Sequence, residues 1–496
     1  MSDRFGAGLT VGGGDLDARA RSVIGAHESR DVPRLERLWA YYRNPLEPVG
    51  REGIGSGERV RAAQERGLPD RVTGRSLDPI DPERGRREVV VENDIGWRVA
   101  SMVDFMFGSP VRIESLAPDS ARRALIEETL ERVWERSGGI ALMQDLATLG
   151  HVYGHVDLLV RVDEAALFGA TAETAGEAVS IEPIEARRGA PIVNRSDYRE
   201  LDGYIVLHPK AGDGADAGDG GRPRRAGLLD RIRGGGAQRG AAERVGELVT
   251  PEGWRRFEGD SVVASGRRGV LSGVVPVVHI QNLSQPFVYS GLGEVEALIP
   301  LQDELNTRLS DRANRVTLQS FKMYLARGIE GFDGSGVGPG TVWSTDNPDA
   351  SITSFGGDAS SPSEDRHIDE IREAMDKISG VPPLAGGVVK ARLGNLSSAN
   401  ALRVTLMGLI AKTKRKRITY GRGIERASAL ALRALDEGGA LRTGEGERGV
   451  RVRWGGLGPL GDIEALETAQ KQMEIGADPA SVLDGLGLDD RDPGVV

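Results

Sequence analysis

Two histidines are the first residues whose spacing could support chemistry. His151 and His155 lie four residues apart, a separation that would place two metal ligands on one face of a helix. Gly150 and Gly154 flank them, and the sequence offers neither a glutamate in a metalloprotease arrangement nor an evident third ligand. Ordinary, partly buried histidines are the simpler interpretation. We therefore predict no metal site and no cofactor.

A glycine-rich stretch and a basic run are the other two candidates. Residues 334–341 lack the lysine of a phosphate-binding loop, and Pro339 removes an amide that such a loop uses. Residues 412–417, Lys-Thr-Lys-Arg-Lys-Arg, fit a nuclear signal or a nucleic-acid patch, but also a solvated or subunit-contacting helix face, which is the simpler interpretation inside an expected helix. With no enzyme motif in the sequence, we predict that the chain is not an enzyme.

Composition narrows the class of protein. The 496 residues carry 64 Lys+Arg and 74 Asp+Glu, for a net charge of −10, and the 69 glycines indicate many turns and long loops. The absence of cysteine excludes a disulfide scaffold and a thiol nucleophile. No secretory signal is visible after Met1, and the longest uncharged run, 269–293, holds prolines and amides that are costly in lipid. We expect a soluble protein without a membrane span.

The spacing of apolar residues predicts an α+β fold that is mainly helical. Expected helices are 33–42, 89–108, 121–136, 140–149, 293–320, 364–378, 396–435 and 462–475. Expected strands are 156–162, 179–184, 204–207, 247–250, 254–257, 274–280, 341–343, 351–355 and 450–454. Residues 1–30 should form a loose arm, residues 50–88 a loop, and residues 209–245 a surface insertion with few apolar side chains.

The helix expected at 364–378 has two contrasting faces. At 100° per residue, four carboxylates gather within about 80°, and they are Asp365, Asp369, Glu373 and Asp376. A second arc is apolar and comprises Ile368, Ile371, Met375 and Ile378. We predict that this arc packs on the preceding long helix through Leu301, Leu305 and Leu309, or on a neighbouring copy. The acidic arc is then left for solvent.

One segment, residues 291–306, resembles the opening of the stem region in portal proteins of tailed bacteriophages. Its sequence is Gly-Leu-Gly-Glu-Val-Glu-Ala-Leu-Ile-Pro-Leu-Gln-Asp-Glu-Leu-Asn. In that family a G-x-S-E…L-Q-D-x-L-N pattern follows a G-x-V-P-V-V strand, which residues 273–278 match. Gly293 departs from the pattern, because the family often has serine there. Three further segments resemble the family and occur in the family's order. The first is Phe-Gly-Ser-Pro-Val at 107–111, and the last is the late strand at 450–454. Between them, Ser-Gly-Val-Pro at 379–382 precedes Asn-Leu-Ser-Ser-Ala-Asn-Ala-Leu at 395–402.

The resemblance spans roughly residues 33–488 and implies a ring of about twelve copies with cyclic symmetry. Such a ring sits at one capsid vertex of the virion, after assembly in the bacterial cytoplasm, and passes double-stranded DNA through a central channel. The implied partners are the terminase motor, the major capsid and scaffolding proteins, and then head-completion and tail proteins. The implied regions are an N-terminal arm (1–32), wing (33–290), first stem helix (291–320), clip (321–363), second stem helix (364–379), tunnel loop (380–394), long wing helix (395–437), late wing strand and helix (438–475) and short crown (476–496).

The implied tunnel loop carries only two charges, Lys390 and Arg392. The resemblance places them against DNA, although they could instead face a neighbouring subunit. The acidic arc would line the channel, where carboxylates let DNA slide without trapping it, or it would look outward at water. Two other classes stay open on the sequence alone: a non-viral ring or scaffold protein that passes no DNA, and an enzyme such as a packaging ATPase, which the missing phosphate loop disfavours.

Overall fold

The computed structural model describes residues 14–15, 17–49, 59–73, 88–197, 199–208, 244–320, 323–327, 347–355, 361–383, 399–456, 469–478 and 482. The chain divides into two compact units. Unit 1 comprises Met1–Tyr42, Gly96–Glu296 and Ser379–Val496, and unit 2 comprises Arg43–Ile95 and Ala297–Ile378. The described elements combine long helices with antiparallel sheets, which confirms the α+β prediction.

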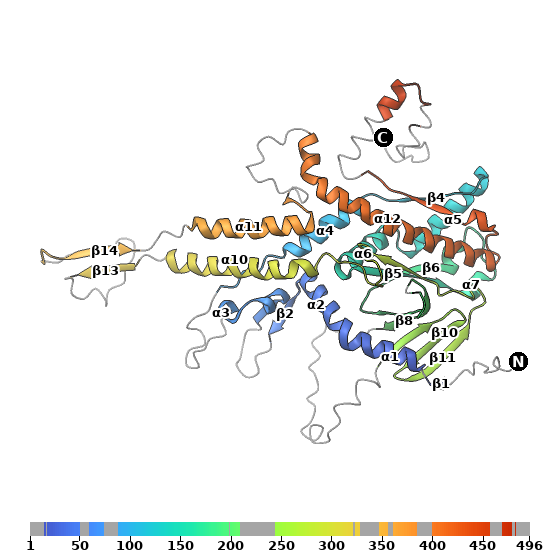
Figure 1. Ribbon diagram of the computed structural model, residues 1–496, viewed down its shortest axis with the longest axis horizontal. Helices are drawn as coiled ribbons and strands as arrows, with labels where there is room; N and C mark the ends of the chain where they lie inside the picture. Colours follow the sequence, from blue (N-terminus) through green and yellow to red (C-terminus); the bar gives the residue numbers. More distant parts are fainter. Residues whose placement is uncertain are drawn as a thin grey trace, which may run out of the picture. The chain divides into compact units, whose positions relative to one another are not determined.

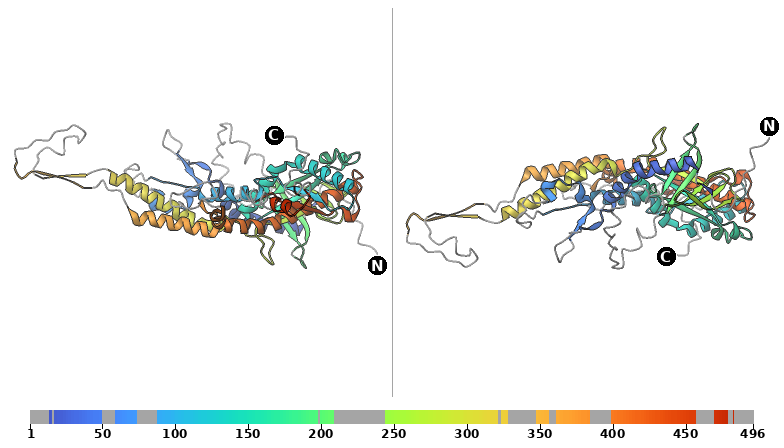
Figure 2. Two further views of the ribbon diagram at one scale, coloured as in Figure 1. Left: turned by 90° about the horizontal axis from the view of Figure 1, so that it is seen from above. Right: turned by 90° about the horizontal axis from the view of Figure 1, so that it is seen from below.

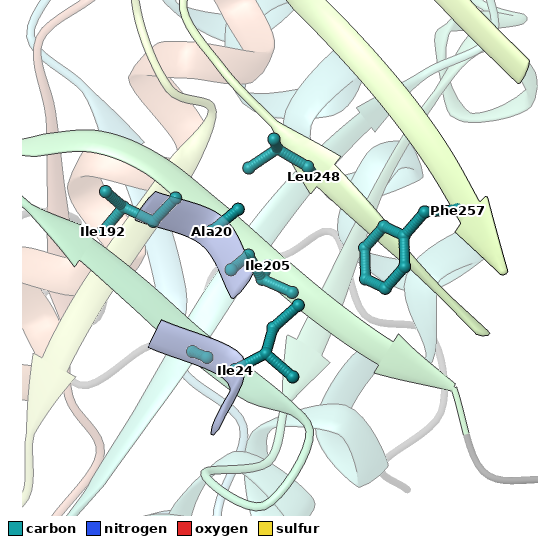
Figure 3. Close-up of a cluster of buried hydrophobic side chains, with 7 residues drawn as sticks. Ala20, Ile24, Ile192, Ile205, Leu248 and Phe257 are labelled. Atoms are coloured by element: carbon teal, nitrogen blue, oxygen red, sulfur yellow. The ribbon is translucent and has the colours of Figure 1, made fainter. Parts of the chain in front are cut away.

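Unit 1 contains a six-stranded antiparallel sheet in the order β1-β11-β10-β9-β8-β7. Its strands are β1 (Gly14–Asp15), β7 (Gly189–Val193), β8 (Leu201–His208), β9 (Val245–Val249), β10 (Gly253–Glu258) and β11 (Ser261–Arg267). Helix α1 (Ala18–Ala26) covers this sheet, because Ala20 and Ile24 lie one turn apart and pack with Ile205 and Phe257 in one buried cluster (Figure 3).

A three-stranded sheet, β12-β5-β6, forms the second layer of unit 1. Its strands are β5 (His155–Val162), β6 (Val179–Ile184) and β12 (Val277–Gln281). Leu159, Ile184 and Val277 from this sheet pack with Tyr204 and Val206 of β8, so a shared core joins the two sheets. The long helix α12 (Ala399–Glu437) lies against all three strands.

The remaining elements of unit 1 surround these layers. They are α2 (Val32–Arg43), most of α4 (Asp94–Phe107), α5 (Ser120–Ser137), α6 (Gly139–Tyr153), the short α7 (Glu164–Leu167) and α8 (Ala175–Ala178), and the paired strands β4 (Arg112–Ser115) and β15 (Val450–Arg453). Helices α5 and α6 meet at Gly138 and Gly139, both with positive φ (126° and 55°), a conformation that ends α5 before α6 begins.

Unit 2 is built on two long antiparallel helices, α10 (Ile299–Ser320) and α11 (Pro362–Ser379), which run side by side in Figures 1 and 2. Between them in the sequence, β13 (Met323–Arg327) pairs antiparallel with β14 (Ser351–Phe355). The unit also holds the pair β2 (Leu46–Val49) and β3 (Arg59–Ala62), and the short α3 (Asp70–Thr73). Among the described helices of the whole chain, none is long and apolar enough to cross a membrane.

Several expected elements need correction. The expected loose arm contains α1, whose apolar pair at Ala20 and Ile24 is too short for a convincing helical period but suffices to dock on a sheet. The loop expected at 50–88 contains β3 and α3, and the strands β7, β11 and β13 were not expected. The strand expected at 341–343, most of the insertion 209–245 and residues 462–468 of the last expected helix lie outside the described residues.

Candidate functional site

The apolar arc of α11 is buried, as its spacing requires. Ile368, Ile371 and Met375 are exposed by 5% or less, and on α10 Leu305 and Leu309 are equally buried, while Leu301 is half-buried. Ile378 differs from the expectation, because 46% of it is exposed. It lies in the last turn of α11, at the edge of the arc. Which partner the arc packs on stays a prediction.

The acidic arc is not simply left for solvent. Asp365 and Glu373 are exposed and Asp369 and Asp376 are half-buried. At the start of α11, Arg312 of α10 donates to Asp365 Oδ1 at 3.0 Å, and Arg315 Nε donates to the adjacent Glu364 Oε2 at 2.8 Å. Arg312 therefore offsets one of the four carboxylates of the arc, whose net negative charge is smaller than the sequence suggested, while Arg315 pairs with Glu364 outside the arc.

A ladder of polar side chains on α10 holds the segment 88–95, which we call the strap. Gln302, Asn306, Ser310 and Asn314 lie one helical turn apart. They bind strap backbone, and the contacts are Asn314 with Glu88 N and O (2.9 and 2.8 Å), Ser310 with Val90 N (3.0 Å), Asn306 with Glu92 N (2.9 Å), and Gln302 with Glu92 O and Ile95 N (2.6 and 3.1 Å). Alternate strap residues are thus recognised through their main chain.

The ladder continues into a buried amide network. Asn306 Nδ2 donates to Gln64 Oε1 at 3.0 Å, and Gln64 Nε2 donates to Asn93 Oδ1 at 2.8 Å. Gln64, Gln302 and Asn306 are fully buried, so each amide must find partners inside the protein. Apolar periodicity does not predict this network, since polar residues on a helix usually indicate a solvent-exposed face. The one signal was the L-Q-D-x-L-N motif, which contains Gln302 and Asn306.

In unit 1, a buried carboxylate lies between two lysines. Glu294 is 5% exposed, with Lys416 Nζ 2.7 Å from its Oε1 and Lys412 Nζ 2.8 Å from its Oε2. Burial alone would raise the pKa of Glu294, but the charges of Lys416 and Lys412 outweigh it and hold the pKa at about 2. Burial lowers the pKa of Lys416 to about 8 despite its partner. The pair is therefore charged at neutral pH.

The same cluster binds the chain segments that lie just before unit 2 begins at α10 and just after it ends at α11. Glu294 comes just before α10, and Lys412 Nζ also donates to the carbonyl of Ser379, at the end of α11, at 2.7 Å. Arg98, 1% exposed, donates to Ser379 Oγ at 2.9 Å and to Val381 O at 2.7 Å. The contacts of Arg98, Lys412 and Lys416 thus join residues of unit 1 that lie next to three of the points where the chain passes between the units.

The basic run 412–417 is divided between two environments. Lys412 and Lys416 point to Glu294, and Arg417 donates to Gly455 O at 2.8 Å, whereas Lys414 and Arg415 are exposed. Only part of the run is available to solvent, which argues against a continuous nucleic-acid patch.

His151 is fully buried and His155 is half-buried, and no shared ligand-binding role emerges for them. Burial lowers the pKa of His151 to about 3 and that of His155 to about 4, so both are neutral at pH 7. The described residues contain no group of three or more potential metal-ligating side chains. Lys390 and Arg392 lie outside the described residues, as does the glycine-rich stretch 334–341.

Comparison with known families supports one of the classes left open by the sequence. Residues 242–479 match the model of the phage portal protein family described as SPP1 Gp6-like. The resemblance to phage portal proteins is confirmed. The portal match runs from β9 past β15, and therefore includes Glu294, α10, α11 and α12. No curated protein matches the chain.

Solved structures give weaker likenesses over most of the chain. The neck of an empty gene transfer agent particle, computed with C6 symmetry, is 15% identical, covers 80% of this chain and 90% of its own, and has a TM-score of 0.45. A native gene transfer agent virion is 15% identical over 91% and 98%, with a TM-score of 0.43. A native neck computed with C12 symmetry is 16% identical over 79% and 89%, with a TM-score of 0.42.

Proposed function

We propose that this chain is a portal subunit. In this proposal, a cyclic ring of about twelve copies forms the DNA channel at one capsid vertex. The observation that carries the proposal is the portal-family match over residues 242–479, which includes both long helices of unit 2 and the long helix of unit 1. The same ring would dock the terminase motor during packaging, and head-completion and tail proteins afterwards.

The portal regions map onto the described elements. Helices α10 and α11 form the stem, β13 and β14 the base of the clip, and unit 1 most of the wing. In this assignment the ladder and the Glu294 cluster have mechanical roles. The ladder ties the strap to the first stem helix, and the cluster fixes the wing at the ends of both stem helices.

Imaging of the purified protein tests the proposal. We expect negative-stain micrographs to show closed rings with a central hole wide enough for a DNA duplex, and we expect no ATP hydrolysis. A protein that stays monomeric at high concentration, or that forms rings without such a hole, would contradict a portal. Robust ATPase activity would contradict it as well.

The channel-lining role of the acidic arc has its own test. Asn or Gln is substituted at all four positions of the arc, Asp365, Asp369, Glu373 and Asp376, and the buried apolar arc is left intact, so rings should still form. If the arc lines the channel, DNA transit should slow, and the effect should shrink with added salt. Glu131→Gln with Glu135→Gln, on the exposed face of α5, is the matched control. Equal transit in both variants would show that the arc does not face DNA.

A further inference from the structure

The loop 283–292 presents a large apolar surface to solvent. Phe287 is 81% exposed, and Val288 and Leu292 are 42% and 48% exposed. Phe287 also has a positive φ of 65°, which is rare for a bulky residue. No residue of this loop carries a charge. An exposed aromatic side chain in an unfavourable backbone conformation is typical of a residue that contacts a partner.

The loop is held in one shape by hydrogen bonds from half-buried polar side chains. The Gln281 side chain accepts from Gln285 N at 2.9 Å and donates to Val288 O at 2.9 Å. His279 lies 2.7 Å from Asp157 Oδ1 and 2.6 Å from Tyr289 O, and its ring stacks on Tyr289 with centroids 3.7 Å apart. The loop therefore presents Phe287 without an ordering cost when a partner binds.

Helix α12 has a second exposed apolar surface, which we call the stripe. Val404, Met407 and Ile418 are 66%, 59% and 57% exposed, and Ala411 lies exposed between them. The spacings of three, four and seven residues place all four on one side of the helix. The stripe is bordered by exposed cations, which are Lys414, Arg415 and Arg422.

The loop and the stripe belong to opposite sides of α12. At 100° per residue, the centre of the stripe is diametrically opposite the buried face of α12, which includes Leu409 and Tyr420. Tyr420 donates to Asn282 Oδ1 at 3.1 Å, and Asn282 Nδ2 donates to Leu292 O at 3.0 Å. The loop is thus tied to the buried face, and within one copy α12 separates it from the stripe.

We infer that the loop 283–292 of one copy packs on the α12 stripe of the next copy, an inference that rests on the proposed ring. A ring needs two unlike surfaces on each subunit, because its contacts are head-to-tail. The charges favour this pairing. Two stripes facing each other would oppose their own cations, whereas an uncharged loop meets no repulsion, and Lys414 or Arg415 can lie over the Phe287 ring.

Cross-linking tests the contact directly, since the chain has no native cysteine. Phe287→Cys is combined with Met407→Cys in the full-length protein, and a short bismaleimide is added so that disulfide geometry is not required. We expect a series of covalent oligomers larger than the dimer on a denaturing gel. Each single variant should give no cross-link, and a mixture of the two single variants should stop at the dimer.

Phe168→Cys with Met407→Cys is the matched control, because Phe168 is 75% exposed at a different place in unit 1. If Phe287→Cys/Met407→Cys forms rings but gives no covalent oligomers, the inference is overturned while the portal proposal stays intact. Cross-linking of either single variant alone would overturn it too, since that shows a symmetric contact. Absence of rings in the unmodified protein would instead refute the proposed function.

Discussion

Replacing Glu294 by glutamine should destabilise unit 1 more than any single surface change. The substitution keeps the shape of the side chain and removes the negative charge between Lys412 and Lys416. The pKa of Glu294 falls from 4.5 to about 2 in the folded protein. At 1.36 kcal/mol per pKa unit, the ionised carboxylate contributes about 3 kcal/mol at pH 7. For a unit of this size, that corresponds to a fall of about 4 °C in Tm.

Acid should reduce this difference. A carboxyl group whose folded pKa is lowered stabilises the protein above its unfolded pKa, and the contribution is lost as pH falls through the folded pKa. For Glu294 the window runs from pH 4.5 down to about 2. At pH 3 the advantage of the native glutamate over glutamine should therefore shrink to about 1 kcal/mol.

Two further variants separate a charge effect from a packing effect. Lys416→Met removes one cation, leaves Lys412 to pair with Glu294, and places a thioether beside Met102, whose Sδ already lies 3.3 Å from Lys416 Nζ. Its cost should be less than half that of Glu294→Gln, and the double variant should cost less than the sum. Glu128→Gln is the control, because Glu128 is an exposed partner of Arg132.

Calorimetry or circular dichroism during heating measures all four variants. A loss of Tm in Glu294→Gln no larger than that in Glu128→Gln would contradict a stabilising charge at Glu294. A Tm difference that stays constant between pH 7 and pH 3 would contradict it as well, because a lost packing contact would not titrate.

Three other predictions concern the ladder and the segments implied by the portal resemblance. Asn306→Ala leaves a buried amide unpaired and should lower the free energy of unfolding by about 2 kcal/mol. Asn314→Ala removes a half-buried side chain that water can replace, so it should lower the free energy of unfolding by less than about 1 kcal/mol. Urea unfolding monitored by hydrogen exchange of the strap amides compares the two variants. Replacing residues 209–245 with a short Gly/Ser linker should leave the ring intact by light scattering, because the segment has few apolar residues. Lys390→Ala with Arg392→Ala should preserve rings but impair DNA packaging, and a normal packaged genome length would contradict a DNA contact.

Long amphipathic elements were predictable from the sequence because their period repeats over several turns. Helix α5 was expected at 121–136 and is observed at Ser120–Ser137, and α11 was expected at 364–378 and is observed at Pro362–Ser379. Helix α1 was missed because two apolar residues one turn apart, Ala20 and Ile24, carry little periodic signal. Strand β7 was missed because Gly189 and Pro191 interrupt its pattern.

The buried polar groups were the least predictable part of the candidate site. Lys412 and Lys416 lie in a run of four other polar residues, so the sequence favoured a solvated face, and only tertiary packing brings Glu294 to them from 118 residues away for Lys412. The burial of Gln302 and Asn306 was not predictable for the same reason. A single sequence gives no reason to bury an amide, because its hydrogen-bond partners are main-chain groups of a distant segment.

The ladder between α10 and the strap works as two rulers with unequal divisions. Four residues of a helix advance about 6.0 Å, whereas two residues of an extended chain advance about 6.6 Å. The mismatch of about 0.6 Å per rung accumulates to about 1.2 Å over the two steps from Glu88 to Glu92, more than the spread of about 0.5 Å in hydrogen-bond lengths. Like a vernier scale, the two segments coincide only over a short overlap. Lengthening α10 beyond Asn314 would therefore give a longer helix without more hydrogen bonds to the strap. One residue inserted into the strap would turn its main-chain groups away from the helix.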